Sequence, residues 1–182
     1  MNTVKLRQLI ILLHLSIAAF LAPAFLLVAV SGGLYLVGQK GAQTSTQLTL
    51  PAGSTLDFKS ANLEDDVRAL LEWANIDEEF EYIKNRGSLI QTRPTSQTYV
   101  EFKQGAEGLS ATRHKPNLQK SMIELHKGHG PLKFKTYQKL VALGLLGVVL
   151  GGFVVGLLAA NYRRKTLIAS ALGFVAFFIL AL

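Results

Sequence analysis

A single histidine, His14, lies inside a long run of uncharged residues near the N-terminus. No Asp, Glu, Lys or Arg occurs between Arg7 and Lys40. An uncharged, apolar run of this length is typical of a helix that crosses a membrane. An imidazole is costly in hydrocarbon unless it finds a partner, so His14 is a candidate functional residue. A hydrogen bond to a serine such as Ser170, contact with a partner subunit, or ligation of a cofactor would each satisfy the ring.

Two further histidines, His126 and His129, lie three residues apart at the end of a predicted helix. A charged His126 at this position complements the helix dipole, and a neutral ring is a potential cofactor ligand. The two rings together resemble half of a metal site. Gly128 predicts a helix end between them, and no third ligand is near, so we expect no metal site.

Three segments are long enough, or nearly so, to cross a bilayer, which takes roughly 20 apolar residues. They are residues 8–38, 140–162 and 166–182. The first extends well beyond the short apolar core of a signal peptide, so we expect an uncleaved anchor rather than a cleaved leader. The chain then divides into an N-terminal anchor (1–38), a middle domain (39–131) and a transmembrane hairpin of two helices (132–182).

Cationic residues flank both ends of the spans, so a simple count of them does not give the orientation in the membrane. One basic triplet decides it. Residues 163–165 (Arg-Arg-Lys) are expected in a loop of only a few residues, where the positive-inside rule is strongest. We therefore predict a cytoplasmic N-terminus and a middle domain on the opposite side. The formal charge of +7 lies mostly beside the spans and fits lipid headgroups. No arginine-rich groove accompanies it, so we expect no nucleic-acid partner.

The middle domain carries all twelve acidic residues and is predicted to mix helix and sheet. Asn62, followed by three acidic residues, predicts a helix start, and apolar residues recur at helical spacing as far as Ala74. Alternating residues between 80 and 113 predict an antiparallel meander of about four strands. Pro116 is expected in the first turn of a second helix, whose apolar stripe comprises Leu118, Met122 and Leu125.

Residues arranged for catalysis do not occur in the sequence. It has no cysteine for thiol chemistry, no glycine-rich phosphate loop and no zinc-protease helix. Trp73 and Phe80 are expected in the core, and His114 in a loop. We therefore lean towards a protein that is not an enzyme.

Glycines recur along the second span with small-x-x-small spacing. Such patterns favour close packing of helices, either within one chain or against a partner. We assign them this packing role. The residues are Gly144, Gly147, Gly151, Gly152 and Gly156.

The order of these features resembles the PepSY-associated transmembrane family. That family opens its first span with a Leu-His pair, places a PepSY-like domain outside the membrane, and has a Leu-His-x-Gly element before its next span. The matching residues here are Leu13-His14 and 125–128, with Ser31-Gly32 near the end of the first span and a basic turn at 163–165. The resemblance implies a multi-pass protein of the bacterial inner membrane with a periplasmic α+β domain between spans one and two.

The resemblance also implies two candidate functions. Larger family members are similar to iron-uptake and ferric-reductase proteins that hold b-type haem between transmembrane histidines. Carried over, His14 becomes a haem ligand on the cytoplasmic side and His126 one on the outer side. Ile168 stands where the family has a partner histidine.

Our first expectation is therefore an accessory subunit that is not catalytic, carries no cofactor and docks onto another integral membrane protein or a second copy. The alternative is a haem b electron-transfer or ferric-reductase component of iron uptake, whose sites are completed by oligomerisation. The first requires no residue that the sequence lacks.

Overall fold

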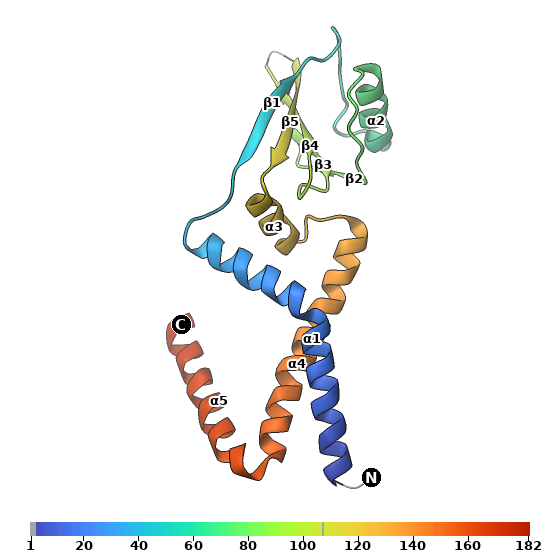
Figure 1. The fold of residues 1–182 in the computed structure, drawn as a ribbon. Coiled ribbons are helices and arrows are strands. Elements are labelled where there is room, and N and C mark those ends of the chain that lie inside the picture. Colours follow the sequence, from blue (N-terminus) through green and yellow to red (C-terminus); the bar gives the residue numbers. More distant parts are fainter. Residues whose placement is uncertain (1–2, 107) are drawn as a thin grey trace. The chain divides into compact units, whose positions relative to one another are not determined.

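The computed structural model describes residues 3–106 and 108–182 (Figure 1). The chain divides into two compact units. We call Met1–Leu26 with Lys139–Leu182 the helical unit, and Leu27–Gln138 the sheet unit. The elements are α1 (Thr3–Leu36), β1 (Gln43–Leu48), α2 (Leu63–Trp73), β2 (Tyr82–Asn85), β3 (Leu89–Arg93), β4 (Tyr99–Gly105), β5 (Gly108–Pro116), α3 (Leu118–His126), α4 (Leu132–Leu158) and α5 (Ala160–Ala181).

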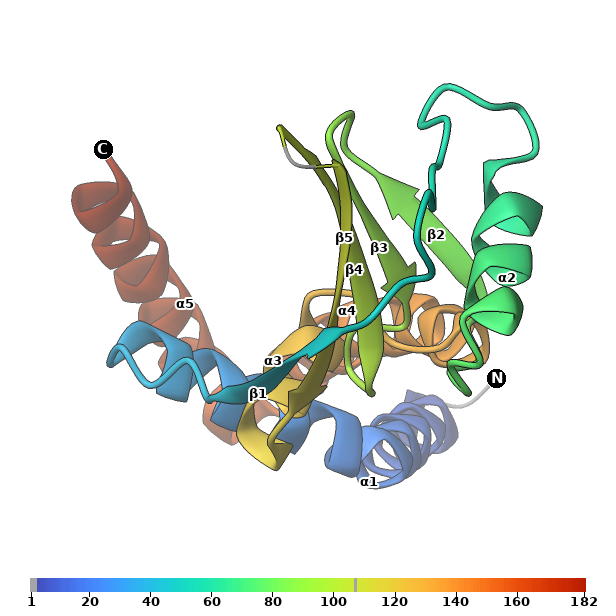
Figure 2. The ribbon, with the colours of Figure 1, turned by 90° about the horizontal axis from the view of Figure 1, so that it is seen from above.

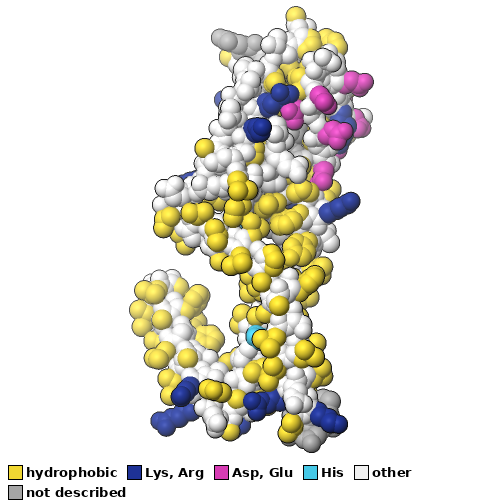
Figure 3. Space-filling model, viewed as in Figure 1, with side chains coloured by type: hydrophobic (Ala, Val, Ile, Leu, Met, Phe, Trp, Pro, Cys, Tyr) yellow, Lys and Arg dark blue, Asp and Glu magenta, His cyan; other side chains and the backbone are white. Residues whose placement is uncertain are grey.

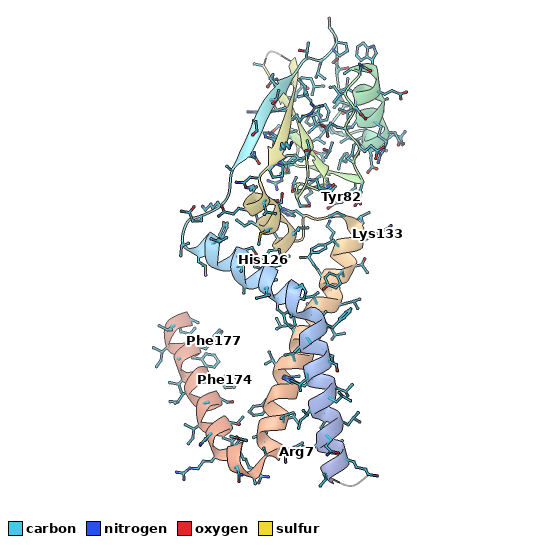
Figure 4. All side chains as sticks on the ribbon, viewed as in Figure 1. Arg7, Tyr82, His126, Lys133, Phe174 and Phe177 are labelled. Atoms are coloured by element: carbon cyan, nitrogen blue, oxygen red, sulfur yellow. The ribbon has the colours of Figure 1, made fainter. Side chains whose placement is uncertain are left out.

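The helices α1, α4 and α5 are each long and apolar enough to cross a membrane, as the sequence predicts. Within the helical unit, Leu21 of α1 and Val141 of α4 are buried. No residue of α5 is buried, and Phe174 and Phe177 project from it largely exposed (Figure 4). Apolar side chains cover this unit, and Lys and Arg gather near its helix ends (Figure 3). Such a distribution fits helices that are surrounded by lipid.

The basic triplet 163–165 does not form the loop that the sequence predicts. The chain turns at Ala159, where φ is −90° and ψ is 105°, and α5 begins at Ala160. The Nε–H of Arg163 donates to the carbonyl oxygen of Leu157 at 2.8 Å. The last carbonyls of a helix have no partner within the helix, and a basic side chain is a good donor to them. The triplet is therefore part of the first turns of α5, and its first member caps the end of α4.

The sheet unit contains one antiparallel sheet of five strands in the order β1-β5-β4-β3-β2 (Figure 2). Strands β2 to β5 form the predicted meander. The edge strand β1 pairs with β5 from Gln43 opposite Pro116 to Leu48 opposite Ala111. The sequence analysis missed β1 because five of its six residues are polar, so no apolar residues alternate along it.

The two faces of the sheet differ because successive residues of a strand point to opposite sides. One face packs against α2 and forms the core, where Val67, Ile90, Val100 and Phe102 are fully buried. Burying each such side chain contributes roughly 1.5–3 kcal/mol. The opposite face carries mostly polar residues, and we call it the polar face. Its members include Gln43, Gln91, Arg93, Tyr99 and Glu101.

The second helix of this unit, α3, begins later than predicted and ends as predicted. Pro116 is the last residue of β5, opposite Gln43 of β1, and does not enter the helix. Asn117 is the N-cap of α3, and its side-chain oxygen accepts from the backbone N–H of Lys120 at 2.8 Å. Gly128 follows α3 with φ +76°, which confirms the predicted end.

The expected apolar stripe of α3 is not its buried face. Leu118 is 79% exposed, and Met122 and Leu125 are only partly buried, whereas Ile123 and Glu124 are buried. A buried glutamate breaks the apolar pattern from which burial was inferred. The strong ion-pair partners of Glu124 described below explain why it is tolerated.

Three smaller expectations have mixed outcomes. Phe80 is buried as expected, but Trp73 is 59% exposed, because it lies two residues beyond Leu71 and so off the buried stripe. His114 is a buried residue of β5, not of a loop. Asn62 precedes α2 as expected but makes no capping hydrogen bond with its side chain.

Candidate functional site

His14 packs against two of the glycines of α4. A Cβ atom added at Gly151 would lie 3.4 Å from the Nδ1 of His14, and one added at Gly152 would lie 3.2 Å from its Cε1. The two glycines therefore make room for the ring. The Nδ1 atom is buried and has no hydrogen-bond partner among the described residues, so Ser170, one of the partners considered from the sequence, does not bond to it.

The other α4 glycines have three different surroundings. A Cβ at Gly144 would meet Leu21 of α1, and a Cβ at Gly156 would lie 2.5 Å from Thr166 Oγ1 of α5. Gly147 has nothing within 4 Å of its Cβ position. It lines a mainly apolar groove of about 480 Å³ between α1 and α4, together with residues that include Ser16, Phe20, Leu143 and Gly144.

His126 forms a defined hydrogen bond within the sheet unit, where its ring lies beside α1 (Figure 4). Its Nδ1 lies 2.9 Å from the Oγ of Ser31, which is itself buried. The single proton of Ser31 goes to the carbonyl of Leu27 at 2.6 Å. The Nδ1 of His126 must therefore donate, and in the neutral ring Nε2 keeps the free lone pair. A partner that fixes the tautomer in this way is typical of ligating histidines.

Capping of α3 is performed by another residue. The side-chain amide of Gln138 donates to the carbonyl of Leu125 at 2.6 Å. His126 instead directs its ring at α1, where a Cβ on Gly32 would lie 3.3 Å from its Cε1. The sequence motifs around Ser31-Gly32 and His126 therefore meet in space.

One copy of the chain supplies few unengaged imidazoles for a haem. His14 is the one histidine of the helical unit. In the sheet unit, His129 is held by Glu124, and His114 stacks on Tyr99 with ring centroids 4.9 Å apart. Nδ1 of both His126 and His129 is bonded, which leaves Nε2 of each ring free, and Nε2 of His114 is buried without a partner among the described residues. The helical unit has no second histidine beside His14, so by itself it does not fit a haem held by two histidines.

The most connected polar residue of the sheet unit is Glu124, which sequence reasoning missed. Its carboxylate accepts from Thr95 Oγ1 at 2.8 Å and lies 2.6 Å from His129 Nδ1 and 3.1 Å from Lys127 Nζ. Burial raises the pKa of Glu124, but the hydrogen bonds from His129, Thr95 and Lys127 outweigh it and lower the pKa to about 2. The carboxylate is therefore ionised at neutral pH.

A buried arginine, Arg93, lies beside this carboxylate on the polar face. It donates to Thr95 Oγ1 at 2.8 Å and to the side-chain oxygen of Gln91 at 3.2 Å. Gln91 in turn donates to Glu101 at 2.9 Å. Arg93 is only 3% exposed, and this burial lowers its pKa. Alternate residues of β3 share a face, so the sequence could have predicted that Gln91 and Arg93 lie on the same side of the sheet.

Comparison with known proteins adds no assignment to this geometry. No protein-family model matches the chain, and no curated protein or solved structure matches it either. Among residues 3–106 and 108–182, no three His, Cys, Asp or Glu side chains are grouped to hold a metal ion.

Proposed function

We propose that this chain is an accessory subunit of the inner membrane that associates sideways with another integral membrane protein and presents its PepSY-like sheet unit outside the cytoplasm. In this proposal it catalyses no reaction itself. The three apolar helices provide the anchor.

The groove beside Gly147 is the observation that carries this proposal. Small residues at helix interfaces in membranes let backbones approach closely, and Gly147 has open space where a Cβ would lie. Ser16 on the α1 side of the groove offers a hydroxyl for an interhelical hydrogen bond. Gly151 and Gly152, by contrast, already face His14. Gly147 is therefore the glycine whose substitution probes a partner rather than packing within the chain.

The test compares two matched substitutions. Gly147→Leu fills the groove, whereas Gly173→Leu adds the same side chain to α5, also with nothing within 4 Å. We expect the Gly147→Leu protein, purified in mild detergent, to lose a partner or a second copy that the unchanged chain and Gly173→Leu retain. Native mass spectrometry measures the mass of the complex. Identical masses for all three proteins would contradict association through this groove.

The haem alternative is favoured by one specific observation, the fixed tautomer of His126. In that alternative His14 and His126 each provide one axial ligand, a second copy provides the other, and the group would supply one-electron chemistry. The visible spectrum of the same preparation, with and without dithionite, separates the two functions. We expect no Soret band. A band that disappears in His126→Ala or His14→Ala would replace our proposal with the alternative.

A further inference from the structure

A small polar pocket lies in the sheet unit between the polar face and α3. It has a volume of about 260 Å³ and is lined by residues of β1, β3, β4 and α3 and by the segments that adjoin them. Arg93 and Tyr99 come from the sheet, and Lys120 and Lys127 from α3 and its C-cap. The pocket is smaller than the roughly 300–1,000 Å³ of sites for drug-sized ligands. Its size therefore selects a small ligand.

The charges that line the pocket are mostly positive. Four cationic side chains, Arg86, Arg93, Lys120 and Lys127, stand against the carboxylates of Glu101 and Glu124. Both carboxylates are engaged, because Glu101 accepts from Gln91, and Glu124 accepts from Thr95, His129 and Lys127 and forms an ion pair with Lys120 at 3.6 Å. This surplus of positive charge favours an anion.

Arg93 has hydrogen-bonding capacity that the protein does not use. A guanidinium has five N–H groups. Arg93 uses two of them, in its hydrogen bonds to Thr95 and Gln91. Neutral side chains thus separate Arg93 from both Glu124 and Glu101, and no carboxylate of the described residues forms a salt bridge with it. A buried charge is normally compensated by a direct counter-charge. An arginine buried to 97% without one is an unusual residue in a structural role.

We infer that this pocket binds a small oxyanion, with Arg93 as the central donor and Lys120 as a second positive charge. The planar fork of a guanidinium matches the geometry of phosphate and carboxylate oxygens. Glu124 and Gln91 hold Thr95 and the guanidinium in place, so they are positioning residues. Tyr99 also lines the pocket; its hydroxyl donates to the side-chain oxygen of Gln43 at 3.3 Å, and burial raises its pKa. This site is independent of the groove beside Gly147.

The experiment titrates inorganic phosphate into the full chain in a neutral detergent, with chloride used to hold the ionic strength constant. We expect a saturable rise in melting temperature, read from the fluorescence of the single tryptophan, Trp73. Arg93→Gln should weaken binding at least about tenfold, since hydrogen bonds to charged groups contribute about 1.5–3 kcal/mol. Lys103→Gln removes a charge from β4 outside the pocket and should leave binding unchanged.

A second variant and a second probe complete the test. Lys120 has a partly exposed side chain on α3, so Lys120→Gln should fold. It should reduce the affinity for phosphate severalfold, and it tests the site even if Arg93→Gln does not fold. Short-chain phosphatidylglycerol replaces phosphate in a parallel titration, and preference for it identifies a lipid headgroup as the source of the oxyanion. A response to neither probe, or an equal response in Lys120→Gln and the unchanged chain, would overturn the inference.

Discussion

Glu124 illustrates how a single residue connects the helix α3 to the sheet. Its two carboxylate oxygens take donors from the turn after β3, from the segment after α3 and from α3 itself. The side chain is 8% exposed, so these interactions are weakly screened by solvent. Removing such a hub leaves several donors without an acceptor, which costs more than losing one hydrogen bond.

We predict that the stability of the sheet unit decreases in acid because of Glu124. Its pKa is about 2 in the folded chain and 4.5 ordinarily, so below pH 4.5 the unfolded state binds the proton first. The stabilisation is complete above pH 4.5 and is lost as the pH falls towards 2, a change of about 3 kcal/mol. Thermal melts between pH 7 and pH 2.5 measure it.

The matched variants for this prediction are Glu124→Gln and Glu64→Gln. Glu124→Gln should lower the melting temperature at pH 7 and make it less sensitive to acid. Glu64 pairs with Arg68 on the exposed surface of α2, so its substitution should change little. Equal acid sensitivity in Glu124→Gln and the unchanged chain would assign the loss of stability to other carboxylates.

The candidate histidines show what residue types and spacing reveal. The uncharged run around His14 and the Leu-His-x-Gly element identified two rings that the structure places against glycines. Neither pattern revealed that Ser31 fixes the tautomer of His126, because the two residues are 95 positions apart. The Glu124 hub was missed for the same reason: Thr95 and Glu124 meet only after the sheet forms.

At the scale of elements, Gly41 sets how closely β1 approaches α3. This glycine has φ +71°, a conformation that other residues adopt at a cost. A Cβ added here would lie 2.8 Å from the Cα of Lys120, which is backbone of α3. A side chain at Gly41 therefore has no room unless one of the two elements moves.

We predict that Gly41→Ala destabilises the sheet unit far more than Gly38→Ala. Both glycines have positive φ, so replacing either with alanine should lower the free energy of unfolding by roughly 1–2 kcal/mol. Gly38 has nothing within 4 Å of its Cβ position, whereas Gly41 adds a clash that costs about 1–3 kcal/mol more. The difference in melting temperature between the two variants measures the clash. No difference would mean that β1 and α3 adjust to each other freely.

The elements that the sequence predicted well are those with a clear apolar period. The stripe that contains Val67, Leu70 and Leu71 identified α2, and the alternation through Val100 and Phe102 identified the meander. The polar strand β1 has no such period and is defined only by its pairing with β5. The predicted start of α5 was wrong for another reason: the basic triplet resembles a loop, but it lies in the helix, where Arg163 donates to the carbonyl of Leu157.

At the scale of the whole chain, the charges divide between the two units. The carboxylates of the described residues all lie in the sheet unit, where acidic side chains gather near α2 (Figure 3). The charged side chains of the helical unit are all cationic and include Lys5, Arg7 and the triplet 163–165. Short basic segments next to spans favour the cytoplasmic side, while a long polar domain crosses largely regardless of its charge.

This division predicts an orientation that two cysteine variants test. Ser88 is exposed in the turn between β2 and β3, and Asn161 is exposed in the first turn of α5. Because the chain has no cysteine of its own, labelling reports only the introduced residue.

The test uses cells whose outer membrane has been made permeable while the inner membrane stays intact. In these cells an impermeant thiol reagent should label Ser88→Cys, and it should label Asn161→Cys only after lysis. The reverse pattern would place the basic triplet outside and contradict the positive-inside argument. Labelling of both positions in intact cells would show that α4 does not cross the membrane. In that case the groove between α1 and α4 would lose its lipid surroundings, since small residues favour association only where helices meet in the bilayer.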